Sequence, residues 1–469
     1  MPLTVPVTGG TAPVATQTVK GIARQLSFNI KDFGPTGTAD DAATLQAAIN
    51  AAAAVNGVVY IPAGTYIVGT SLLVNATVSL VGEGKYTSII KVKNNTNIFA
   101  FTLAAGGGAT QLSSVHMRNL CIDGNNTNQT TGGGCISAQY LVHSSFAWCR
   151  FTNACEVGVW LQGATGGAFG HNNSFFGCLF DNGKFSTGTN NGQGLRTNSC
   201  DENFIVACDF EYNGSAGGAN NFAVYDNSGT NFFTGVNFVN GANGYKLQSS
   251  PNSRLTGCHW DGVGGDAVQI TSTGAVITGC TFSSPGFTAT NTYSAIRVAF
   301  AGGGHTITGN QITTPATGAP FTTRSFYREG GATIPSLVAN NTIISGSTGN
   351  TGYTSFGTAL LEDGGIGTVY SLTGAALYSV QSQAANYTLT PLDATLIVTS
   401  GSHIMTLPAI ATVPKGKTYT VTNSNMTNTT LATTSAQTIN GATTYTLAAA
   451  YASVTVISDG TQWWVVSKI

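Results

Sequence analysis

Short segments in which every second residue is apolar recur at nearly constant spacing through most of the chain. The clearest repeat lies near the middle, where residues 255–260 match residues 277–282 after a step of 22 residues. A second alternating segment follows each of them, at residues 267–270 and 295–298. Two short strands per unit, a glycine turn between them and a regular step are typical of a parallel β-helix.

Two columns of residues set the register of the predicted β-helix. The first column runs through Leu120, Cys149, Cys178, Cys208, Val236, Cys258, Cys280, Asn310 and Asn341. The second column lies two residues later in each unit, at Ile122, Phe151, Phe180, Phe210, Phe238, Trp260, Phe282, Ile312 and Ile343. Because side chains alternate across a strand, we expect both columns to face inward, where the rings of the second column stack on one another.

Five of the nine cysteines fall in the first column, and we expect them to be reduced and to pack as small apolar side chains. No Cys-x-x-Cys pair is present and the six histidines are scattered, so we expect no metal site and no other cofactor. Asn310 and Asn341, at the end of the column, predict inward amides that form hydrogen bonds along the stack.

The segment before the repeats predicts a helix and a pair of strands. Residues 42–51 have an apolar helical face and follow Asp40 and Asp41, either of which is a good N-cap. Residues 57–66 (Gly-Val-Val-Tyr-Ile-Pro-Ala-Gly-Thr-Tyr) then predict a strand, a turn and a second strand. This arrangement resembles the N-terminal segment of the pectate-lyase-like right-handed parallel β-helix superfamily, which includes phage tailspikes that depolymerise polysaccharides. The resemblance implies that the helix covers the open end of the β-helix, which would otherwise be an exposed sheet edge.

The repeats stop near residue 365. We expect residues 366–386 to be a linker with one or two strands, and residues 387–469 to form a separate antiparallel, sandwich-like β domain. The runs Gly-Lys-Thr-Tyr-Thr-Val-Thr-Asn and Ala-Ser-Val-Thr-Val-Ile-Ser-Asp-Gly-Thr-Gln-Trp-Trp-Val-Val resemble C-terminal modules of phage tail fibres and tailspikes, which commonly join three chains or bind sugar. The predicted fold class is all-β: a right-handed parallel β-helix over residues 28–365 with an N-terminal capping helix, followed by a C-terminal antiparallel β domain.

Charged residues are scarce in this chain. Only 8% of residues are charged and the formal net charge is −1, so nothing favours a nucleic acid or a membrane surface as a partner. No apolar run reaches the ~18 residues of a membrane-spanning helix, and the N-terminus does not have the pattern of a signal peptide. Residues 1–27 lack periodicity, which is typical either of a flexible terminus or of a short anchor to a partner.

Acidic residues gather on the predicted outer surface of the central coils, and the candidate catalytic residues are Asp181, Asp209, Glu211 and Asp261. Asp181 and Glu211 are expected at the same position on adjacent coils, about 5 Å apart at the backbone, with Asp209 about 8 Å from Asp181. Carboxylate pairs at such separations serve both retaining and inverting glycosidases, so the stereochemistry stays open. The alternative is structural, because acids at strand ends often accept hydrogen bonds from turn N–H groups.

A second outward row is expected on the strand that follows. We assign substrate binding to Trp160, Arg196, Tyr225, Lys246 and Arg297 of this row and to His259 of the acidic face. Aromatic rings stack on sugar faces and guanidinium groups bind carboxylates, so the row fits a long glycan, including an acidic one. An ordinary solvated face is the alternative.

The resemblance implies a phage tailspike that binds and depolymerises a bacterial surface polysaccharide, whether capsule, O-antigen or exopolysaccharide. It also implies a homotrimer in the virion tail, made in the host cytoplasm and attached to the phage tail or to an adaptor protein through the N-terminal segment. We favour endo-acting glycoside hydrolysis, and we expect the site in the longer coils at residues 178–246. Two alternatives are a polysaccharide lyase acting by β-elimination and a non-catalytic receptor-binding tail protein.

Overall fold

The computed structural model describes the chain from residue 26 to residue 469, apart from a set of internal segments. These segments are residues 35–38, 107–109, 164–168, 184–191, 212–221, 249–251, 286–292, 299–303, 315–323, 329–336, 340, 346–360, 364–368, 372–379, 392, 414, 425–426 and 435. The predicted anchor segment therefore lies almost wholly outside the described residues. The chain divides into two compact units, Met1–Leu372 and Thr373–Ile469.

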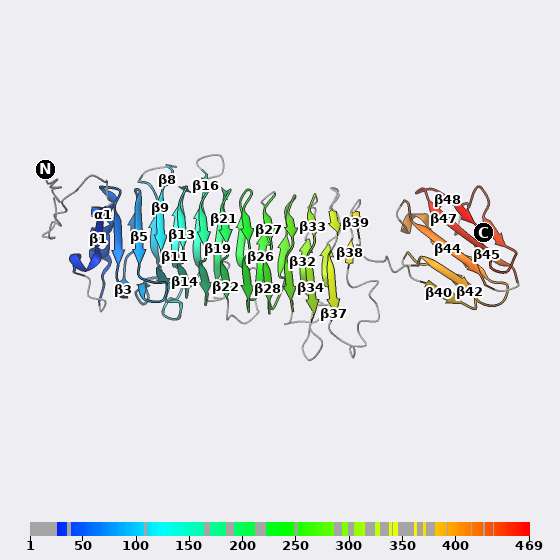
Figure 1. Ribbon diagram of the computed structural model, residues 1–469, viewed down its shortest axis with the longest axis horizontal. Coiled ribbons are helices and arrows are strands. Elements are labelled where there is room, and N and C mark those ends of the chain that lie inside the picture. Colours follow the sequence, from blue (N-terminus) through cyan, green and yellow to red (C-terminus); the bar gives the residue numbers. More distant parts are fainter. Residues whose placement is uncertain are drawn as a thin grey trace. The chain divides into compact units, whose positions relative to one another are not determined.

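Three long parallel sheets wind into a β-helix in the first unit, and each full coil gives one strand to each sheet (Figure 1). The first sheet contains β1 (Ser27–Asn29), β2 (Val58–Ile61), β5 (Val78–Gly82), β9 (Val115–Arg118), β13 (Ser145–Ala147), β17 (Ser174–Phe176), β21 (Phe204–Val206), β24 (Phe232–Thr234), β27 (Arg254–Thr256), β30 (Val276–Thr278), β33 (Thr306–Thr308), β36 (Leu337–Ala339) and β39 (Val369–Ser371). The second contains β3 (Gly64–Val68), β6 (Ser88–Val92), β10 (Cys121–Asp123), β14 (Arg150–Thr152), β18 (Leu179–Asp181), β22 (Asp209–Glu211), β25 (Asn237–Val239), β28 (His259–Asp261), β31 (Thr281–Ser283), β34 (Gln311–Thr314) and β37 (Thr342–Ser345).

The third sheet closes each coil. It contains β4 (Leu72–Val74), β7 (Phe99–Leu103), β11 (Gly134–Gln139), β15 (Val157–Gln162), β19 (Gln193–Asn198), β23 (Phe222–Asn227), β26 (Asn243–Leu247), β29 (Val268–Ile270), β32 (Ser294–Val298), β35 (Arg324–Arg328) and β38 (Leu361–Asp363). A short fourth sheet joins β8 (Leu112–Ser113), β12 (Leu141–Val142), β16 (Gly170–His171) and β20 (Cys200–Asp201). The predicted parallel β-helix is thereby confirmed.

The two inward columns have the predicted register. Strand pairing aligns Ile122 with Phe151, Phe151 with Phe180, and so on through Trp260, Phe282 and Ile312. The rings form a buried stack, with centroids 4.4 Å apart between Phe180 and Phe210 and 4.6 Å apart between Trp260 and Phe282. Such stacking of like side chains fixes the vertical alignment of the coils, because a slip of one residue would turn the rings outward.

All nine cysteines are buried thiols outside any disulfide, as expected for the five in the first column. Burial raises the pKa of Cys121 and of Cys200 to about 12, so these thiols stay protonated at neutral pH. The amides at the end of the column behave as predicted: Asn310 Nδ2 donates to Asn341 Oδ1 at 2.9 Å. The thiols therefore act as core residues, in keeping with their apolar surroundings.

A second polar stack inside the β-helix was not predicted. Its members hydrogen-bond from coil to coil and are Ser144, Asn173, Asn203, Asn231 and Ser253. The stack ends at Asp226, which is fully buried and accepts hydrogen bonds from Tyr245 (2.6 Å), Thr197 (2.7 Å), Ser253 (2.8 Å) and Asn231 (2.9 Å). Burial raises the pKa of Asp226, although these four donors act in the opposite direction. Buried polar groups are thus fully paired here, as a stable core requires.

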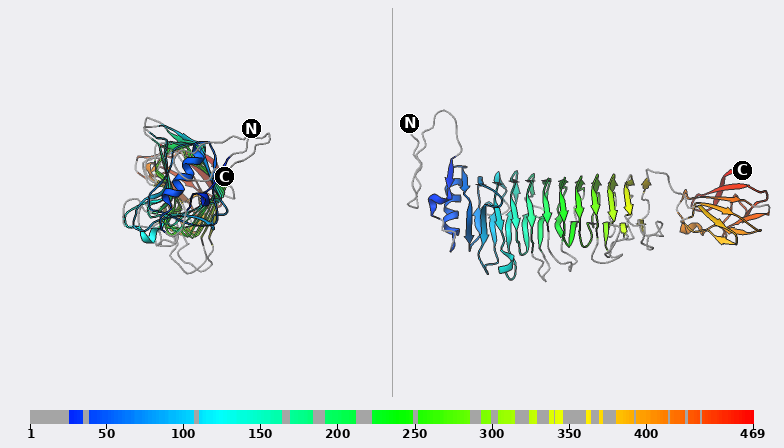
Figure 2. Two further views of the ribbon diagram at one scale, coloured as in Figure 1. Left: turned by 90° about the vertical axis from the view of Figure 1, so that its left-hand side faces the viewer. Right: turned by 60° about the horizontal axis from the view of Figure 1, so that its bottom comes forward.

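Helix α1 (Ala42–Ala53) lies across the N-terminal end of the β-helix, as Figure 2 shows end-on. Its apolar face is buried through Ala42, Leu45, Ala48, Ile49 and Ala52, which confirms the predicted cap. Asp41 precedes the helix, but its carboxylate accepts a hydrogen bond from the Ile67 N–H of β3 instead of capping the helix. Short 3₁₀ turns occur at η1 (Ile30–Phe33) and η2 (Asn126–Asn128). Within the described residues, no helix is long and apolar enough to cross a membrane.

The second unit is a β domain with its own core, in which Tyr419 and Trp463 are fully buried. One sheet contains β40 (Val380–Gln383), β42 (Thr395–Val398), β44 (Thr418–Asn423), β47 (Ser453–Ser458) and β48 (Trp463–Lys468). The other contains β41 (Tyr387–Thr388), β43 (Ile404–Thr406), β45 (Thr429–Ala432) and β46 (Thr444–Leu447), and η4 (Ile410–Thr412) follows β43.

The prediction of wholly antiparallel pairing in this domain was wrong. The strands β40, β42 and β44 pair in parallel, as do β41, β43 and β45, and only the last strands of each sheet pair antiparallel. Alternation of apolar and polar residues reports which face of a strand is buried, but it carries no information on strand direction. The stretch predicted as a linker holds β39, which pairs with β36 of the β-helix, and β40, which pairs with β42 of the second unit.

Candidate functional site

The outer face of the second sheet carries the predicted acids in two rows. One row aligns Asp123, Thr152, Asp181, Glu211, Val239, Asp261 and Ser283. The other aligns Cys121, Arg150, Leu179, Asp209, Asn237, His259 and Thr281. Asp181 and Glu211 therefore do occupy equivalent positions on adjacent strands, β18 and β22.

Asp181 is engaged by a cation that sequence reasoning overlooked. Arg150 Nε lies 3.2 and 3.1 Å from the two carboxylate oxygens, and its Nη2 lies 2.5 Å from Oδ2. The Asp181 side chain is 7% exposed and that of Arg150 is 25% exposed. Although partial burial lowers the pKa of Arg150, the hydrogen bonds and charge of Asp181 raise it overall. Asp181 thus forms a largely buried ion pair with the preceding coil and presents little surface to a ligand.

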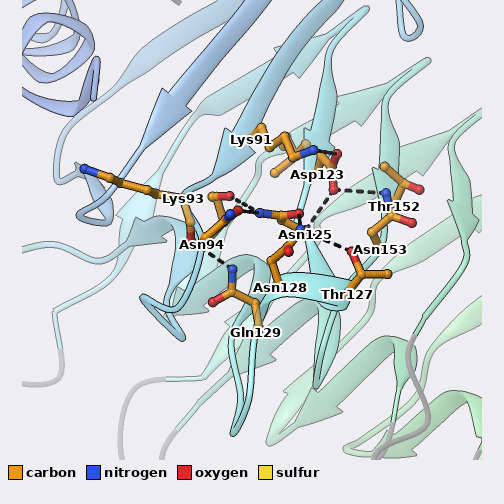
Figure 3. Close-up of polar contacts among 12 residues, drawn as sticks. Lys91, Lys93, Asn94, Asp123, Asn125, Thr127, Asn128, Gln129, Thr152 and Asn153 are labelled. Carbon is orange, nitrogen blue, oxygen red and sulfur yellow. Dashed lines mark hydrogen bonds and ion pairs between the residues drawn. The ribbon is translucent and has the colours of Figure 1, made fainter. Parts of the chain in front are cut away.

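Asp123, at the head of the same row, is used by a turn. Its Oδ1 accepts a hydrogen bond from the backbone N–H of Asn125 at 2.8 Å and another from Asn153 Nδ2 at 3.0 Å, as Figure 3 shows. Asn125 has a positive φ of 54° and its side-chain amide donates to Val92 O and to Asn94 Oδ1. Lys91 Nζ lies 3.8 Å from the Asp123 carboxylate. For this acid, the structural alternative of a carboxylate that holds a turn is the correct interpretation.

Glu211 and Asp261 are the acids of this row that remain open to solvent. Both are exposed, and within the described part of the chain neither carboxylate has a hydrogen-bond or ion-pair partner. Asp209 is half-buried and accepts a hydrogen bond from Asn237 Nδ2 at 2.7 Å. Asp209 and Glu211 flank the buried Phe210 on one strand, so their backbones are about 6.6 Å apart and both side chains point outward.

His259 lies on strand β28 with Asp261, but in the row of Asp209, two coils beyond that residue. Its Nδ1 lies 2.6 Å from Thr281 Oγ1 on the next strand. The sheet therefore gathers Asp209, Glu211, His259 and Asp261 over three coils, while Asp181 sits at the edge of this group in its pair with Arg150.

The outer face of the third sheet carries the second predicted row. Strand pairing aligns Trp160, Arg196, Tyr225, Lys246, Gln269, Arg297 and Tyr327 on successive coils. The residues from Trp160 to Arg297 are all half-buried. The register that the sequence suggested for Tyr225 holds, because Arg196 and Lys246 are its direct neighbours.

Cations and rings alternate in contact along this row. The Arg196 guanidinium lies 4.7 Å from the Trp160 ring centroid and 5.5 Å from that of Tyr225. Lys246 Nζ lies 5.7 Å from the Tyr225 ring and 5.4 Å from that of Phe222, a residue that sequence reasoning did not single out. Such contacts are attractive because a ring face carries negative charge density.

The electrostatics of the row favour an anion. Burial lowers the pKa of Arg196, with partial opposition from Tyr225 and Glu156, and burial followed by repulsion from Arg297 lowers the pKa of Lys246. Arg196 Nε donates to Asn198 Oδ1, while the buried Nη1 has no hydrogen-bond partner among the residues described. Arg297 differs, because its Nη1 lies 3.3 Å from the buried carboxylate of Asp266.

The acids and the aromatic row lie on different sheets of the same coils. Strand β22 carries Asp209 and Glu211, and strand β23, the next in the chain, carries Tyr225. The site was expected in the longer coils at residues 178–246, of which residues 184–191 and 212–221 lie outside the described residues. No group of three or more His, Cys, Asp or Glu suited to a metal ion occurs in the described portion of the molecule.

Comparisons with known proteins agree with this architecture. Residues 27–177 match the family model of rhamnogalacturonase A and epimerase, pectate lyase-like, and residues 142–312 match that of the right-handed β-helix region. The predicted resemblance to the pectate-lyase-like right-handed β-helix proteins is confirmed by these matches.

Two solved structures share the fold. A tailspike protein of Escherichia coli bacteriophage HK620 has a TM-score of 0.55 at 14% identity, with 86% of this chain and 81% of that chain covered. Tailspike protein 2 of an Escherichia coli O157:H7 bacteriophage has a TM-score of 0.53 at 13% identity, covering 73% of this chain and 48% of that chain. At these identities the likeness shows the fold alone.

Curated relatives match a smaller part of the chain. Mannuronan C5-epimerase AlgE3 of Azotobacter vinelandii is 38% identical over 115 residues, which are 22% of this chain and 6% of that protein. The epimerase AlgE4 of the same organism is 35% identical over 113 residues, or 20% of its own length. The chain thus spans only a minor part of the proteins that it matches in sequence.

Proposed function

We propose that this protein is a phage tailspike that binds and depolymerises a bacterial surface polysaccharide by glycoside hydrolysis. The observation that carries the proposal is a carboxylate pair, the exposed Glu211 and the half-buried Asp209, on the outer surface of the coil that also carries the half-buried Tyr225. Depolymerisation of a long chain needs an exposed, linear binding surface, and in-register rows along a β-helix provide one. The tailspike fold of the solved relatives supports this choice of function.

The separation of the pair favours inversion. The two residues lie two positions apart on one strand, about 6.6 Å apart at the backbone. Inverting glycosidases keep their carboxyl groups ~6.5–9.5 Å apart, and we infer that side chains extending side by side from these positions keep a similar separation. We assign Glu211 as the general acid that protonates the glycosidic oxygen, and Asp209 as the general base. Asp209 would take a proton from a water molecule that attacks the anomeric carbon as the glycosidic C–O bond breaks. The hydrogen bond from Asn237 holds the Asp209 carboxylate in place for this role.

The remaining candidates receive other roles. Asp181 positions Arg150 at the edge of the site through their ion pair, and the proposal gives it no proton transfer. Asp261 and His259 lie on β28, two coils beyond β22, where they would contact sugar hydroxyl groups of the bound chain. Trp160, with the rest of the third-sheet row, would hold the polymer by ring stacking and charge.

A second candidate function is β-elimination or epimerisation of a uronic acid polymer. The observation that favours it is the pair of cations Arg196 and Lys246, since both reactions need a positive group against the uronate carboxylate while a base removes the neighbouring proton. The curated relatives are mannuronan epimerases by name, which points in the same direction. A third candidate, a non-catalytic receptor-binding tail protein, uses the same surface without chemistry.

The assembly belongs to the same proposal. A tailspike role implies a homotrimer in the virion tail, with residues 1–27 as the attachment to the phage tail or to an adaptor protein. The second unit, from residue 373, would join the three chains or bind sugar.

The proposal is tested by incubating the protein with capsule, O-polysaccharide and exopolysaccharide of candidate hosts and measuring polymer length by gel filtration. Shortened chains with new reducing ends and no near-ultraviolet absorbance support hydrolysis. Unsaturated products that absorb in the near ultraviolet would support elimination instead. Binding without any shortening would leave only the receptor-binding function.

A further inference from the structure

The cations of the third-sheet row recur on every second coil. The order along the β-helix is Trp160, Arg196, Tyr225, Lys246, Gln269 and Arg297, so uncharged residues separate the three cations. Neighbouring coils lie about 4.8 Å apart, which spaces the cations by about 9.6 Å along the axis. That distance is the length of a disaccharide unit in an extended polysaccharide.

Arg196 and Lys246 lack the acidic partner that Arg297 has. Arg297 is paired with Asp266, whereas no ion pair within the described residues involves Arg196 or Lys246. Both are about half-buried, and the rings of Trp160, Phe222 and Tyr225 cover their flanks. A partly desolvated cation without an ion-pair partner is costly, and an anionic ligand relieves that cost.

We propose that the row binds an acidic polysaccharide with a negative charge on alternate sugars, lying along the axis of the β-helix over the third sheet. Arg196 and Lys246 each bind one acidic group, and the uncharged sugar between them lies over Tyr225. The inference rests on the proposed polysaccharide-binding function and adds the charge pattern of the polymer.

The residues between the cations discriminate against the other charge patterns. A polymer with a charge on every sugar would place an anion at Tyr225 and another at Gln269, and the negative face of the Tyr225 ring repels an anion. A neutral polymer would leave both cations unpaired and partly stripped of water. Alternation of charge in the polymer is therefore the pattern that matches the alternation in the row.

Affinity electrophoresis tests the proposal with three polymers cast into native gels. Hyaluronan carries one carboxylate per disaccharide, polygalacturonate carries one on every sugar, and dextran carries none. We expect the strongest retardation by hyaluronan, weaker retardation by polygalacturonate and none by dextran. Equal or stronger retardation by polygalacturonate or dextran, or no retardation by any of the three, would overturn the proposal.

Variants assign the effect to the row. Arg196→Gln and Lys246→Gln should each weaken hyaluronan binding by about tenfold or more, because each removes a charge-assisted contact, and Arg196→Lys should lie between Arg196→Gln and the unaltered protein. Arg254→Gln is the matched control, since Arg254 also lies over a ring, that of Phe232 on the first sheet, at 5.9 Å. Thermal unfolding of each variant shows whether the fold is intact. Unchanged binding by both Gln variants would contradict the assignment.

Failure of this inference differs from failure of the proposed function. If the protein shortens a host polysaccharide that proves to be neutral, hydrolysis stands and the charge pattern is wrong. If hyaluronan binds through Arg196 and Lys246 but no host polymer is shortened, the binding row stands and the catalytic proposal is wrong.

Discussion

Replacement of Arg150 by methionine is expected to destabilise the β-helix while leaving the catalytic pair intact. The change removes the guanidinium group that contacts both oxygens of Asp181 and keeps an unbranched apolar side chain in its place. Asp181 then becomes a largely buried carboxylate without its counter-charge, and a carboxylate in that position is unfavourable. The reciprocal change, Asp181→Asn, should be milder because the Arg150 side chain is 25% exposed and can turn toward water.

The expected loss in the free energy of unfolding follows from the contacts and the burial of the Arg150–Asp181 pair. Hydrogen bonds to charged groups contribute ~1.5–3 kcal/mol, and breaking a fully buried ion pair costs ~3–5 kcal/mol. Because the arginine end of this pair reaches solvent, we expect Arg150→Met to lower the free energy of unfolding by about 2–3 kcal/mol and Asp181→Asn by about 1–2 kcal/mol. Because the unfolding entropy grows with length, a unit that extends to Leu372 loses only about 1.4 °C per kcal/mol, so Arg150→Met should lower Tm by about 3–4 °C.

Urea unfolding of both single variants and of the double variant measures the coupling between the two residues. The double variant should be more stable than the sum of the single losses predicts, because it leaves no unpaired buried charge. Tyr86→Leu is the control for the second contact of Arg150, whose guanidinium lies 5.2 Å from the exposed Tyr86 ring. If Asp181→Asn abolished cleavage without loss of stability, Asp181 would be a catalytic residue and the structural role given to it here would be refuted.

Three further predictions concern catalysis, the buried carboxylate and assembly. Glu211→Gln and Asp209→Asn should each reduce cleavage by ~10²–10⁴-fold with Tm nearly unchanged, as measured by reducing-end release; a loss of folding would instead indicate a structural role. Burial raises the pKa of Asp226, so the folded protein binds a proton at this carboxyl group more tightly than the unfolded chain does. The contribution of Asp226 to stability is therefore greatest below about pH 4 and falls as the pH rises through the raised pKa. Asp226→Asn should remove this pH dependence, so urea unfolding should show a smaller loss of stability at pH 7 than at pH 4. An equal loss at both pH values would refute the link between this carboxyl group and stability. Tyr245→Phe, which removes one donor to Asp226, should lower the free energy of unfolding by about 1–3 kcal/mol. Light scattering should give the molar mass of three chains, and a monomer at micromolar concentration would contradict the trimer.

The register of the β-helix could be predicted because its core repeats chemically. Aromatic residues that stack from coil to coil must keep one position per coil, so Phe180, Phe210 and Trp260 mark the same place in their coils. They thereby show which neighbouring residues on the same strand point outward. The outward rows then followed by alternation along each strand. That is why the neighbours of Tyr225 were named correctly although turns of variable length separate the strands.

The partners of individual side chains could not be predicted in the same way. Arg150 stands at the outward position between Cys149 and Phe151, but nothing in the sequence shows that its side chain reaches Asp181 on the next coil. The residue types did offer a signal, because an arginine beside a row of acids is a natural counter-charge for the nearest of them. Asp226 was harder to find, because a buried acid stabilised by four donors from other strands has no local pattern.

The direction of pairing in the second unit was missed for a physical reason. A hydrophobic alternation such as that of β44 and β47 is the same in parallel and antiparallel sheets, so it did not reveal the direction of pairing. In the structure β42 pairs in parallel with β44, so the chain between them crosses over before it returns. Only the last strands of each sheet have the predicted antiparallel arrangement.

Polymer length after incubation with host surface polysaccharide tests the central claim most directly. The unaltered protein should shorten its polysaccharide, and Glu211→Gln should bind the same polymer in affinity electrophoresis without shortening it. A host polysaccharide that is bound but never shortened by the unaltered protein, or one that Glu211→Gln shortens at the unaltered rate, would contradict the account.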